Sequence, residues 1–495
     1  MKKINFKLIF GFTVVLGLIS CSDVLDESPD NRTEINSLEK ISELLVSAYP
    51  ESTYIAFLEP LSDNAGDKSL SAEASDLNLM MFTWQDFFDD DNDTPTNYWN
   101  TAYEAISQAN QALLSLEELG ELDTPQRGEA LLCRAYAHYM LVNIFAKAYD
   151  PATASTDLGV TYITEPEITL LPQYARNTVQ EVYDNIQSDL VEGLLYITDD
   201  YDEPKFHFTK AAANAFASRF YLTIGEWQKV IDHSNVTLGN GTGVNAIRDY
   251  TNDYRAAGLS YSERSFRYFS SIEQANLLLT VGESTYARNH YSERFQLNDD
   301  VASLLFFQGN AAGLAWSEQV FGQDLFYNTP KFDEYFRITN QAAGIGLAFL
   351  QVAILTGDET MFNRAEAYAM LGDFQSAVDD VNTLLSVKSQ NYSSASILGL
   401  ADITSVIDPN FYTPFYSIPA DALPIIDLIL ETKRSVHYNE GLRWFDIKRH
   451  DIAIDHTYDK TPNNPITISL VKGDNRRALQ IPAEAQARGI EPNIR

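Results

Sequence analysis

The sequence predicts a mainly α-helical protein in which tetratricopeptide-like helical pairs form a scaffold, long irregular inserted loops form a second subdomain, and there is little sheet. Three observations support this fold class. Apolar residues recur three or four positions apart, glycine and an aromatic residue separate consecutive apolar stripes, and long aromatic-rich segments lack a period. The 495 residues are 45% hydrophobic and 21% charged, so the chain can bury a large core and is too apolar to be disordered.

Three helices are predicted in the first 200 residues from apolar spacing alone. Their stripes run over residues 99–116, 130–146 and 179–194. A stripe of this width marks a helix that buries one face and leaves the other to solvent.

Two later segments have the layout of a helix-turn-helix pair. In the first, a stripe from Ala213 ends at Gly225-Glu226-Trp227 and a second stripe follows to Leu238. In the other, a stripe around Ala365 ends at Gly372-Asp373-Phe374 and continues to Leu385. Glycine ends the first helix of each pair and an aromatic residue opens the second, which is typical of tetratricopeptide-like units.

Irregular, aromatic-rich segments interrupt the helical pattern near residues 51–97, 239–360 and 391–430. Loops of this length in a compact protein usually carry function or form a subdomain of their own. We therefore expect one helical domain over residues 36–495 with these three insertions, and we expect the binding site to lie among the insertions.

The N-terminus has the three-part layout of a secretory signal. Lysines precede an apolar run that is too short for a transmembrane helix, and Ser20-Cys21 follows. Leu18-Ile19-Ser20-Cys21 resembles the bacterial lipobox, so residues 1–20 are predicted to be a signal peptide and Cys21 the lipidated first residue. An ordinary secretory peptide with an incidental cysteine is the alternative. Residues 21–35 form an acidic linker that resembles the export tag of surface lipoproteins.

The charge balance excludes several classes of partner. The chain has 35 Lys and Arg against 69 Asp and Glu, a net charge of −34 at pH 7. This field repels phosphate backbones and anionic lipid head groups, so nucleic acid is not an expected partner. The other cysteine, Cys133, lies in an apolar helical stripe and is expected to be a buried hydrophobe.

The sequence contains none of the common catalytic motifs that were considered. It contains no His-Glu-x-x-His, Gly-x-Ser-x-Gly or P-loop motif, and its seven histidines lack metal-ligand spacing. Residues 89–93 resemble the first ligands of a calcium loop, but Thr94 and Asn100 replace the required glycine and glutamate of an EF-hand. The sequence thus predicts no enzyme, no cofactor and no metal site, although a pair of acids at glycosidase separation could arise in the fold.

Several blocks together resemble the SusD/RagB family of outer-membrane nutrient-binding lipoproteins. They span nearly the whole chain from Cys21 and are Arg127-Gly128-Glu129-Ala130, Arg134-Ala135-Tyr136, Arg176 with Thr178-Val179, Glu181-Val182-Tyr183, Ile186, Asp189-Leu190, Gly225-Glu226-Trp227, Arg364-Ala365-Glu366, Glu440-Gly441-Leu442-Arg443-Trp444-Phe445-Asp446, Lys448-Arg449, Ile481-Pro482-Ala483-Glu484 and Pro492-Asn493. The chain departs from the family pattern at His450, Thr161 and Lys147-Ala148, which are scaffold positions. By physical reasoning the blocks are scaffold too: Arg443 and Asp446, three apart on one helix, could pair with each other.

The resemblance implies a function. Family members are cell-surface lipoproteins that capture a polysaccharide or oligosaccharide and deliver it to a SusC-like TonB-dependent outer-membrane transporter, so the implied partners are a glycan, that transporter and the membrane through a lipid anchor. Two alternatives remain open at this stage: a surface-anchored glycoside hydrolase, and a helical-repeat adaptor that binds only protein or peptide.

Candidate ligand-binding residues come from the irregular segments, because sugar rings stack on aromatic side chains and their hydroxyls bond to polar ones. Trp99, Trp227 and Trp444 lie in helical stripes or turns and are expected in the core. The aromatic candidates are Trp84, Trp316, Tyr54, Tyr286 and Tyr291, and the polar candidates are Asp63, Asn64 and Asp67.

Overall fold

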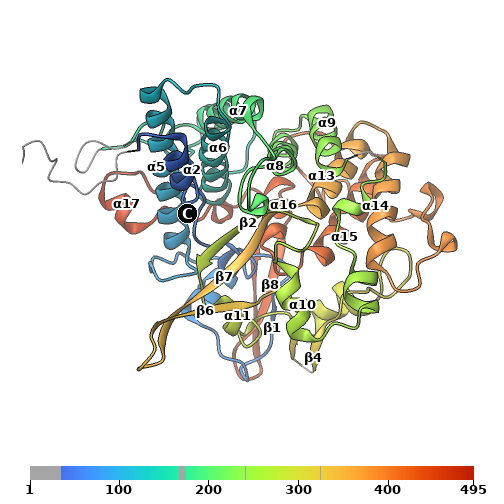
Figure 1. Ribbon diagram of the computed structural model, residues 1–495. Coiled ribbons are helices and arrows are strands. Elements are labelled where there is room, and N and C mark those ends of the chain that lie inside the picture. The colour runs from blue at the N-terminus through green and yellow to red at the C-terminus, as the bar shows by residue number, and fades with distance from the viewer. Residues whose placement is uncertain (1–34, 167–172, 240, 324) are drawn as a thin grey trace, which may run out of the picture.

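The structure is a computed structural model that describes residues 35–166, 173–239, 241–323 and 325–495. Helices form one side of the molecule, and strands with short helices form the other (Figure 1). The predicted fold class is confirmed: a helical-pair scaffold carries long irregular segments with little sheet. The predicted signal peptide, Cys21 and the acidic linker up to residue 34 lie outside the described residues.

The scaffold consists of ten helices among the described residues. They are α2 (Leu38–Leu45), α5 (Pro95–Leu119), α6 (Pro125–Phe145), α7 (Val179–Tyr196), α8 (Lys210–Thr223), α9 (Trp227–Leu238), α13 (Gly357–Met370), α14 (Phe374–Lys388), α15 (Leu423–Val436) and α16 (Leu442–Arg449). Consecutive helices pack on each other as α5–α6, α6–α7, α8–α9 and α13–α14, and α13 also packs on α9. One continuous hydrophobic core runs through these contacts.

Glycine ends the first helix of each predicted pair, and capping residues define the start of another helix. The turns after α8 and α13 contain Gly225 at φ 76° and Gly372 at φ 81°, a left-handed conformation that side chains with a Cβ disfavour. Both predicted helix-turn-helix pairs are therefore present. Helix α7 begins with a capping box in which Thr178 and Glu181 bond reciprocally to backbone amides.

The irregular side contains short helices and small antiparallel sheets. Its helices are α3 (Ile55–Leu58), α4 (Asp76–Phe82), α10 (Tyr261–Tyr268), α11 (Tyr286–Asn289) and α12 (Asp299–Ala302), with α17 (Ala483–Ala487) near the C-terminus. Its strands are β1 (Gly66–Asp67), β2 (Asn276–Glu283), β3 (Phe295–Gln296), β4 (Phe321–Gln323), β5 (Phe326–Asn328), β6 (Glu334–Asn340), β7 (Ile345–Thr356), β8 (Ile454–Thr461) and β9 (Asn464–Leu470). The sheets are β2-β7-β6 and the pairs β1-β3, β4-β5 and β8-β9.

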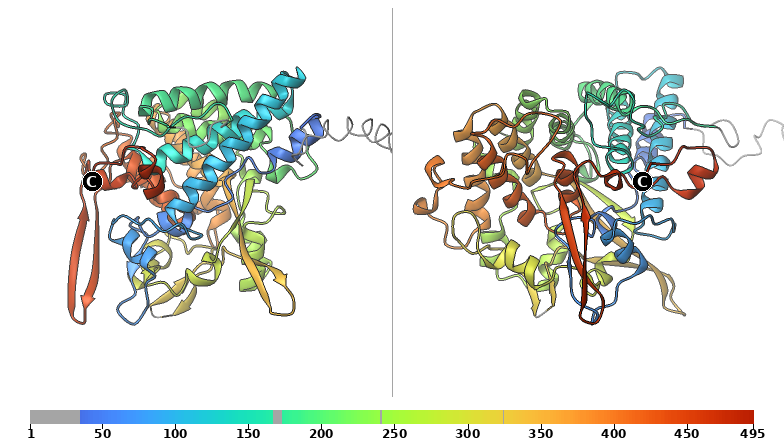
Figure 2. Two further views of the ribbon diagram at one scale, coloured as in Figure 1. Left: turned by 90° about the vertical axis from the view of Figure 1, so that its left-hand side faces the viewer. Right: turned by 180° about the vertical axis from the view of Figure 1, so that it is seen from behind.

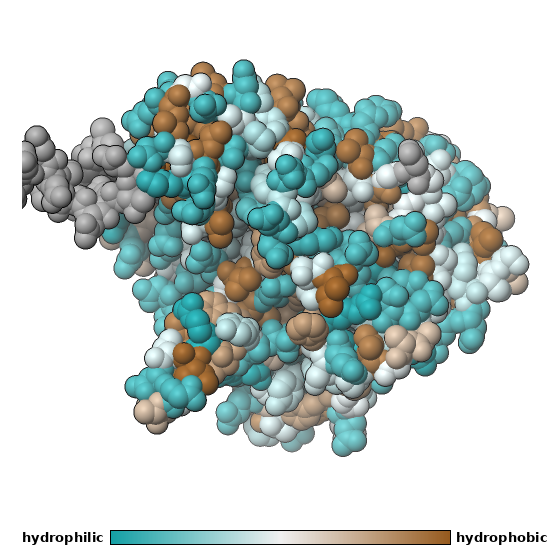
Figure 3. Space-filling model, viewed as in Figure 1, coloured by the Kyte–Doolittle hydropathy of each residue, from teal (hydrophilic) through white to brown (hydrophobic). Residues whose placement is uncertain are grey.

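Two hairpins, β6–β7 and β8–β9, project from the irregular side (Figure 2). The face seen in Figure 3 is mostly hydrophilic, and hydrophobic residues appear on the projecting β6–β7 hairpin. Tyr335, Ile338 and Ile345 of this hairpin are all at least half exposed. The β8–β9 hairpin lies outside the three predicted insertions, and the domain boundaries given above stay predictions.

A buried ion cluster joins the irregular side to the helical scaffold. Asp358 at the start of α13 contacts the ammonium of Lys388 at 2.5 Å and the guanidinium of Arg248 at 3.6 Å, and all three side chains are fully buried. Burial alone would raise the pKa of Asp358, but these two cations hold the pKa below its usual value. Since a buried charge without its partner is costly, this cluster fixes how residues 244–276 sit on α13 and α14.

A neutral histidine fixes the segment after α6. The Nδ1 of His138 lies 2.9 Å from the carbonyl of Arg134, its Nε2 accepts a hydrogen bond from the amide of Ile163 at 3.0 Å, and its ring stacks on Tyr162. One nitrogen donates and the other accepts, so the ring needs no charge. Burial lowers the pKa of His138 to about 3.

We expect His138 to contribute acid sensitivity to the fold. Because its pKa is near 3 folded and about 6.5 unfolded, the unfolded chain binds the extra proton, and the stabilisation present above pH 6.5 is lost as the pH falls toward 3. Against His138→Gln, which does not titrate, the wild-type chain should lose up to about 1.4 kcal/mol more per pH unit below pH 6. Urea unfolding at pH 7, 6, 5 and 4 measures this, and parallel curves would contradict it.

Candidate functional site

A cavity of about 420 Å³ opens where two of the irregular segments meet. One wall comes from residues 75–94, which lead into α5, and the other from residues 285–296, around α11 and β3. The lining residues are Ala56, Ser75, Asp76, Leu77, Asn78, Phe87, Asp89, Asp91, Asn92, Asp93, Thr94, Thr285, Tyr286, Asn289, Glu293 and Gln296. This volume lies within the range of small-molecule sites.

Polar side chains hold the two walls together at the start of α4. The side chain of Asn78 donates to the carbonyl of Phe295 at 3.1 Å and accepts from its amide at 3.0 Å. Glu293 accepts a hydrogen bond from the amide of Ser75 at 2.9 Å. These three bonds join segments more than 200 positions apart, so the shape of the cavity is set before any ligand binds.

Tyr286 is buried at the base of the cavity and is held from the scaffold side. Its hydroxyl donates to Asn439 at 2.6 Å and accepts from Gln296 at 3.1 Å. Glu59 in turn accepts from the amides of Asn439 at 2.8 Å and Gly441 at 2.9 Å. Burial raises the pKa of Tyr286 well above its usual value, so its hydroxyl stays protonated and keeps donating.

Asp93 lies deep in the cavity wall and is 6% exposed. Its Oδ2 accepts a hydrogen bond from the amide of Thr285 at 3.0 Å, while its Oδ1 has no hydrogen-bond partner among the described residues. Burial raises the pKa of Asp93, and nearby donors from Ser284, Thr285 and Tyr286 offset part of that rise. A buried acceptor without a donor is costly, so Asp93 adds an incompletely satisfied acid to the cavity wall.

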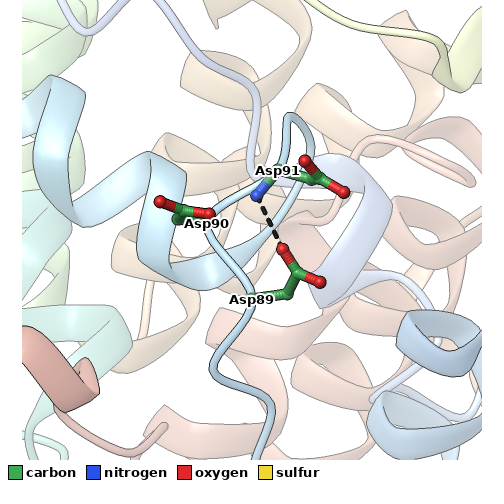
Figure 4. Close-up of side chains that lie close together, drawn as sticks. All are labelled: Asp89, Asp90 and Asp91. Atoms are coloured by element: carbon green, nitrogen blue, oxygen red, sulfur yellow. Dashed lines mark hydrogen bonds between the residues drawn. The ribbon is translucent and has the colours of Figure 1, made fainter.

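Three exposed acids, Asp89, Asp90 and Asp91, lie close together on the loop before α5 (Figure 4), and the first and last of them line the cavity. One carboxylate oxygen each from Asp89, Asp90 and Asp91 lies within 4.8 Å of the others, and Asp89 accepts a hydrogen bond from the amide of Asp91 at 3.1 Å. The turn after them is closed by Thr94, which caps α5 by accepting from the amide of Asn97. The loop thus enters a helix at the position where an EF-hand would continue with glycine.

The two tryptophans predicted to stack on sugar are buried. Trp84 is 3% exposed, donates its indole N–H to the carbonyl of Leu61 and stacks on His456 with ring centroids 4.3 Å apart. Trp316 is 7% exposed and pairs as an isolated bridge with Ser389. Neither ring offers a free face in this structure and neither lines the cavity, so the expected stacking is not supported.

The three tyrosine candidates differ in their burial and in whether they line the cavity. Tyr54 is buried between Tyr98 and Phe445, which leaves it no free face. Tyr291 is 48% exposed but does not line the cavity. Tyr286 does line it, although its ring serves as a buried base rather than an exposed platform.

The polar candidates are engaged by the protein itself, which corrects their expected role. Asp63 binds Arg443 through both carboxylate oxygens at 2.9 Å, and Asn64 bonds to Arg434 and Glu59. Asp67 binds Arg294 in the same bidentate way at 2.6 and 2.8 Å. Their oxygens are therefore committed to guanidinium groups and do not reach the cavity.

The pairing expected inside α16 is also wrong. Arg443 turns to Asp63 and Glu431, whereas Asp446 binds Lys433 and Arg449. Bidentate geometry with a carboxylate on another element outcompetes a partner one turn along the helix.

Sequence reasoning missed most of the residues that form the cavity. The acidic run 89–93 was noticed for its calcium-like spacing, but the carboxylates of Asp76 and Glu293 carry no local signal. What brings them together is the Asn78–Phe295 contact across the fold, which only the structure reveals.

Known proteins resemble the chain both in sequence and in fold. The model of a SusD-like family described as "Starch-binding associating with outer membrane" matches residues 23–222. The SusD-like proteins P2 and P38 of Formosa agariphila are each 26% identical, over 257 and 246 residues, which is 48% and 46% of this chain. The alignments span 47% and 44% of these relatives, about half of their length.

Solved structures extend the likeness over the whole scaffold. A SusD superfamily protein from Bacteroides thetaiotaomicron gives a TM-score of 0.63 at 19% identity, covering 93% of this chain and 100% of that one. A SusD-like carbohydrate binding protein from Bacteroides vulgatus gives 0.60 at 16% identity, covering 91% and 96%. The predicted resemblance to the SusD/RagB family is confirmed.

The SusD-like fold explains why scattered sequence blocks agree, because several of them supply buried contacts of the helical scaffold. Arg134 of α6 binds Asp189 of α7, and Arg449 of α16 binds Glu366 of α13. Among the described residues, no helix is long and apolar enough to cross a membrane.

The role assigned to Asp63 predicts a stability defect. Burial alone would raise the pKa of Asp63, but Arg434 and Arg443 hold the pKa well below its usual range. In Asp63→Asn both guanidinium groups lose that charge but keep Glu431 as a partner, so we expect the free energy of unfolding to fall by about 1.5–3 kcal/mol. Denaturant unfolding measures this against Asp379→Asn, an exposed acid on α14 whose loss should change stability by less than about 0.5 kcal/mol. Equal stability of the two variants would contradict the structural role.

Proposed function

We propose that this chain is a cell-surface lipoprotein that binds a polysaccharide or oligosaccharide and delivers it to a TonB-dependent outer-membrane transporter. The observation that carries the proposal is the cavity formed by residues 75–94 and 285–296, on loops that a rigid helical scaffold holds in place. The family description, starch-binding and associated with the outer membrane, supports the same conclusion.

The chemistry of the cavity suits a sugar. Carboxylates of Asp89, Asp91 and Glu293 are hydrogen-bond acceptors, and sugar hydroxyls are donors. Phe87 contributes a half-buried aromatic ring that can pack on the C–H face of a pyranose. Together these groups offer directional bonds and an apolar contact without requiring any covalent step.

The proposal also includes delivery of the glycan to the transporter and anchoring of the chain by a lipid. Lipidation of Cys21 would tether the chain through the linker that leads to α2. The apolar side chains on the β6–β7 hairpin support contact with a protein, because contiguous exposed apolar residues mark interaction sites. Both points rest also on what the family resemblance implies.

Binding at the cavity is tested by calorimetry with purified chain and a panel of polysaccharides. For the preferred glycan, Phe87→Ala should weaken binding several-fold, because an aromatic contact contributes about 0.5–1.5 kcal/mol. Asp91→Ala should weaken it about tenfold or more, because a charged hydrogen bond contributes about 1.5–3 kcal/mol. Glu118→Ala, an exposed acid at the far end of α5, is the matched control and should bind like wild type. Unchanged affinity in both cavity variants would place the site elsewhere, and release of free sugar during incubation would favour the hydrolase alternative.

Delivery is tested by co-purification. After mild detergent extraction of the native membrane, the tagged chain should bring down a large outer-membrane protein of the TonB-dependent class. Cys21→Ala separates anchoring from partner binding: it should leave the membrane fraction yet still bind that protein when extracts are mixed. Repeated recovery of the chain alone would remove the transporter from the proposal.

A further inference from the structure

The described part of the cavity wall is acidic and contains no cationic side chain. Five carboxylates line it, and among the described lining residues there is no lysine, arginine or histidine. The five are Asp76, Asp89, Asp91, Asp93 and Glu293. Asp90 adds a further exposed carboxylate beside Asp89 and Asp91.

The cations nearest in sequence to the 285–296 wall are committed elsewhere. Arg288 binds Glu334 of the β6–β7 hairpin through two bonds of 2.5 Å, and Arg294 binds Asp67. Burial lowers the pKa of His290 to about 4, so this ring is neutral at pH 7.

Lys68 is a nearby cation that interacts electrostatically with an acid of the cavity. It interacts with Glu293, but its ammonium is buried and donates to the carbonyl of Tyr291 at 2.7 Å. One of the five acids is thus partly compensated. The others face the cavity without a cation of their own among the lining residues.

A second observation concerns the kind of group that the wall can bond. The Oδ1 of Asp93 is buried in this wall and accepts no hydrogen bond from the described residues, and the side chain is only 6% exposed. The carboxylates that a ligand can reach are the exposed ones of Asp89 and Asp91, and an ionised carboxylate only accepts hydrogen bonds. A hydroxyl or an ammonium can donate to them, whereas a sulfate or a carboxylate cannot.

We infer that this cavity selects glycans that carry no negative charge, either neutral sugars or amino sugars, and rejects uronates and sulfated sugars. The inference rests on the proposed glycan-binding function and specifies its substrate class. The acidic groups of an anionic sugar are hydrogen-bond acceptors, so they cannot bond to the carboxylates of the wall. On binding they would also lose hydrating water and be repelled by the like charge. These costs disfavour anionic ligands relative to neutral or cationic ones.

The experiment uses the glycan that binds best in the panel and changes only its charge. Oxidation of its primary hydroxyls to carboxylates makes an anionic form, and methyl esterification of that product restores neutrality at nearly the same shape. By calorimetry at low salt, the oxidised form should bind at least about tenfold more weakly than the parent, and the ester should recover most of that loss. Added salt should reduce the difference by screening.

Variants test whether the cavity acids cause the discrimination. Asp89→Asn with Asp91→Asn removes two exposed charges, while the amide introduced at position 89 keeps an oxygen that can accept from the backbone N–H of residue 91, so the fold should tolerate both changes. In this double variant, the difference in affinity between the parent and the oxidised glycan should be several-fold smaller than in the wild type. The control, Glu117→Gln with Glu118→Gln, makes the same charge change near the far end of the 25-residue helix α5, about 30 Å or more away, and should leave the gap unchanged.

Three outcomes would overturn the inference. The oxidised glycan could bind as well as the parent. It could bind poorly in both the acid form and the ester, which would indicate a steric effect. An anionic glycan could bind only with calcium and lose binding in EDTA, which would make the acids a cation-bridged site. Failure of the proposed function itself looks different, because then no glycan of any charge would bind.

Discussion

The architecture depends on ionic groups buried between the helical scaffold and the irregular side. Asp358 of α13 is in contact with Lys388 of α14 and with Arg248, which comes from the segment after α9. A second such contact joins Lys331, before β6, to Glu440 before α16 at 2.8 Å. Apolar packing alone would tolerate small shifts between the two halves, but a charge sealed from water tolerates no loss of its partner. These contacts therefore fix the position of the loops on the scaffold.

The same constraint reaches the cavity through a short chain of hydrogen bonds. Glu59, which follows α3, holds the backbone at Asn439 and Gly441, and Asn439 receives the hydroxyl of Tyr286. Residues 439–441 include Glu440, which Lys331 binds. A side chain at the base of the cavity is thus positioned by the ionic contacts between the two halves. Pre-set geometry of this kind lowers the ordering cost of binding, and it explains why family-like blocks without a ligand role matter to the site.

The sequence predicts the scaffold well and the site poorly, for one physical reason. Helical pairs are encoded locally, in apolar spacing and in glycines such as Gly225 and Gly372, so they can be read without a structure. The cavity is encoded by contacts such as Asn78 with Phe295, more than 200 positions apart. Trp84 illustrates the failure. Its place in an irregular segment made it a candidate for stacking on sugar, but Phe295, Phe82, His456 and Trp84 form a continuous ring stack with successive centroids 4.0, 4.0 and 4.3 Å apart. The acidic run at 89–93 can be identified in the sequence, but its place in the wall of the cavity follows only from the residues that lie near it in the fold.

The negative net charge of the chain is distributed unevenly, because some acids pair with arginine and others have no cationic partner among the described residues. Acids held within the fold are matched by arginine on both sides of the molecule, as in Asp63 with Arg443, Asp67 with Arg294, Asp189 with Arg134 and Asp380 with Arg364. With 35 cations against 69 acids, such pairing draws on the scarcer charge, and most of the surplus acids must lie where water or a ligand can meet them. The cavity is one such place. The cavity is acidic because the guanidinium groups that could attract an anion are used in ion pairs within the fold.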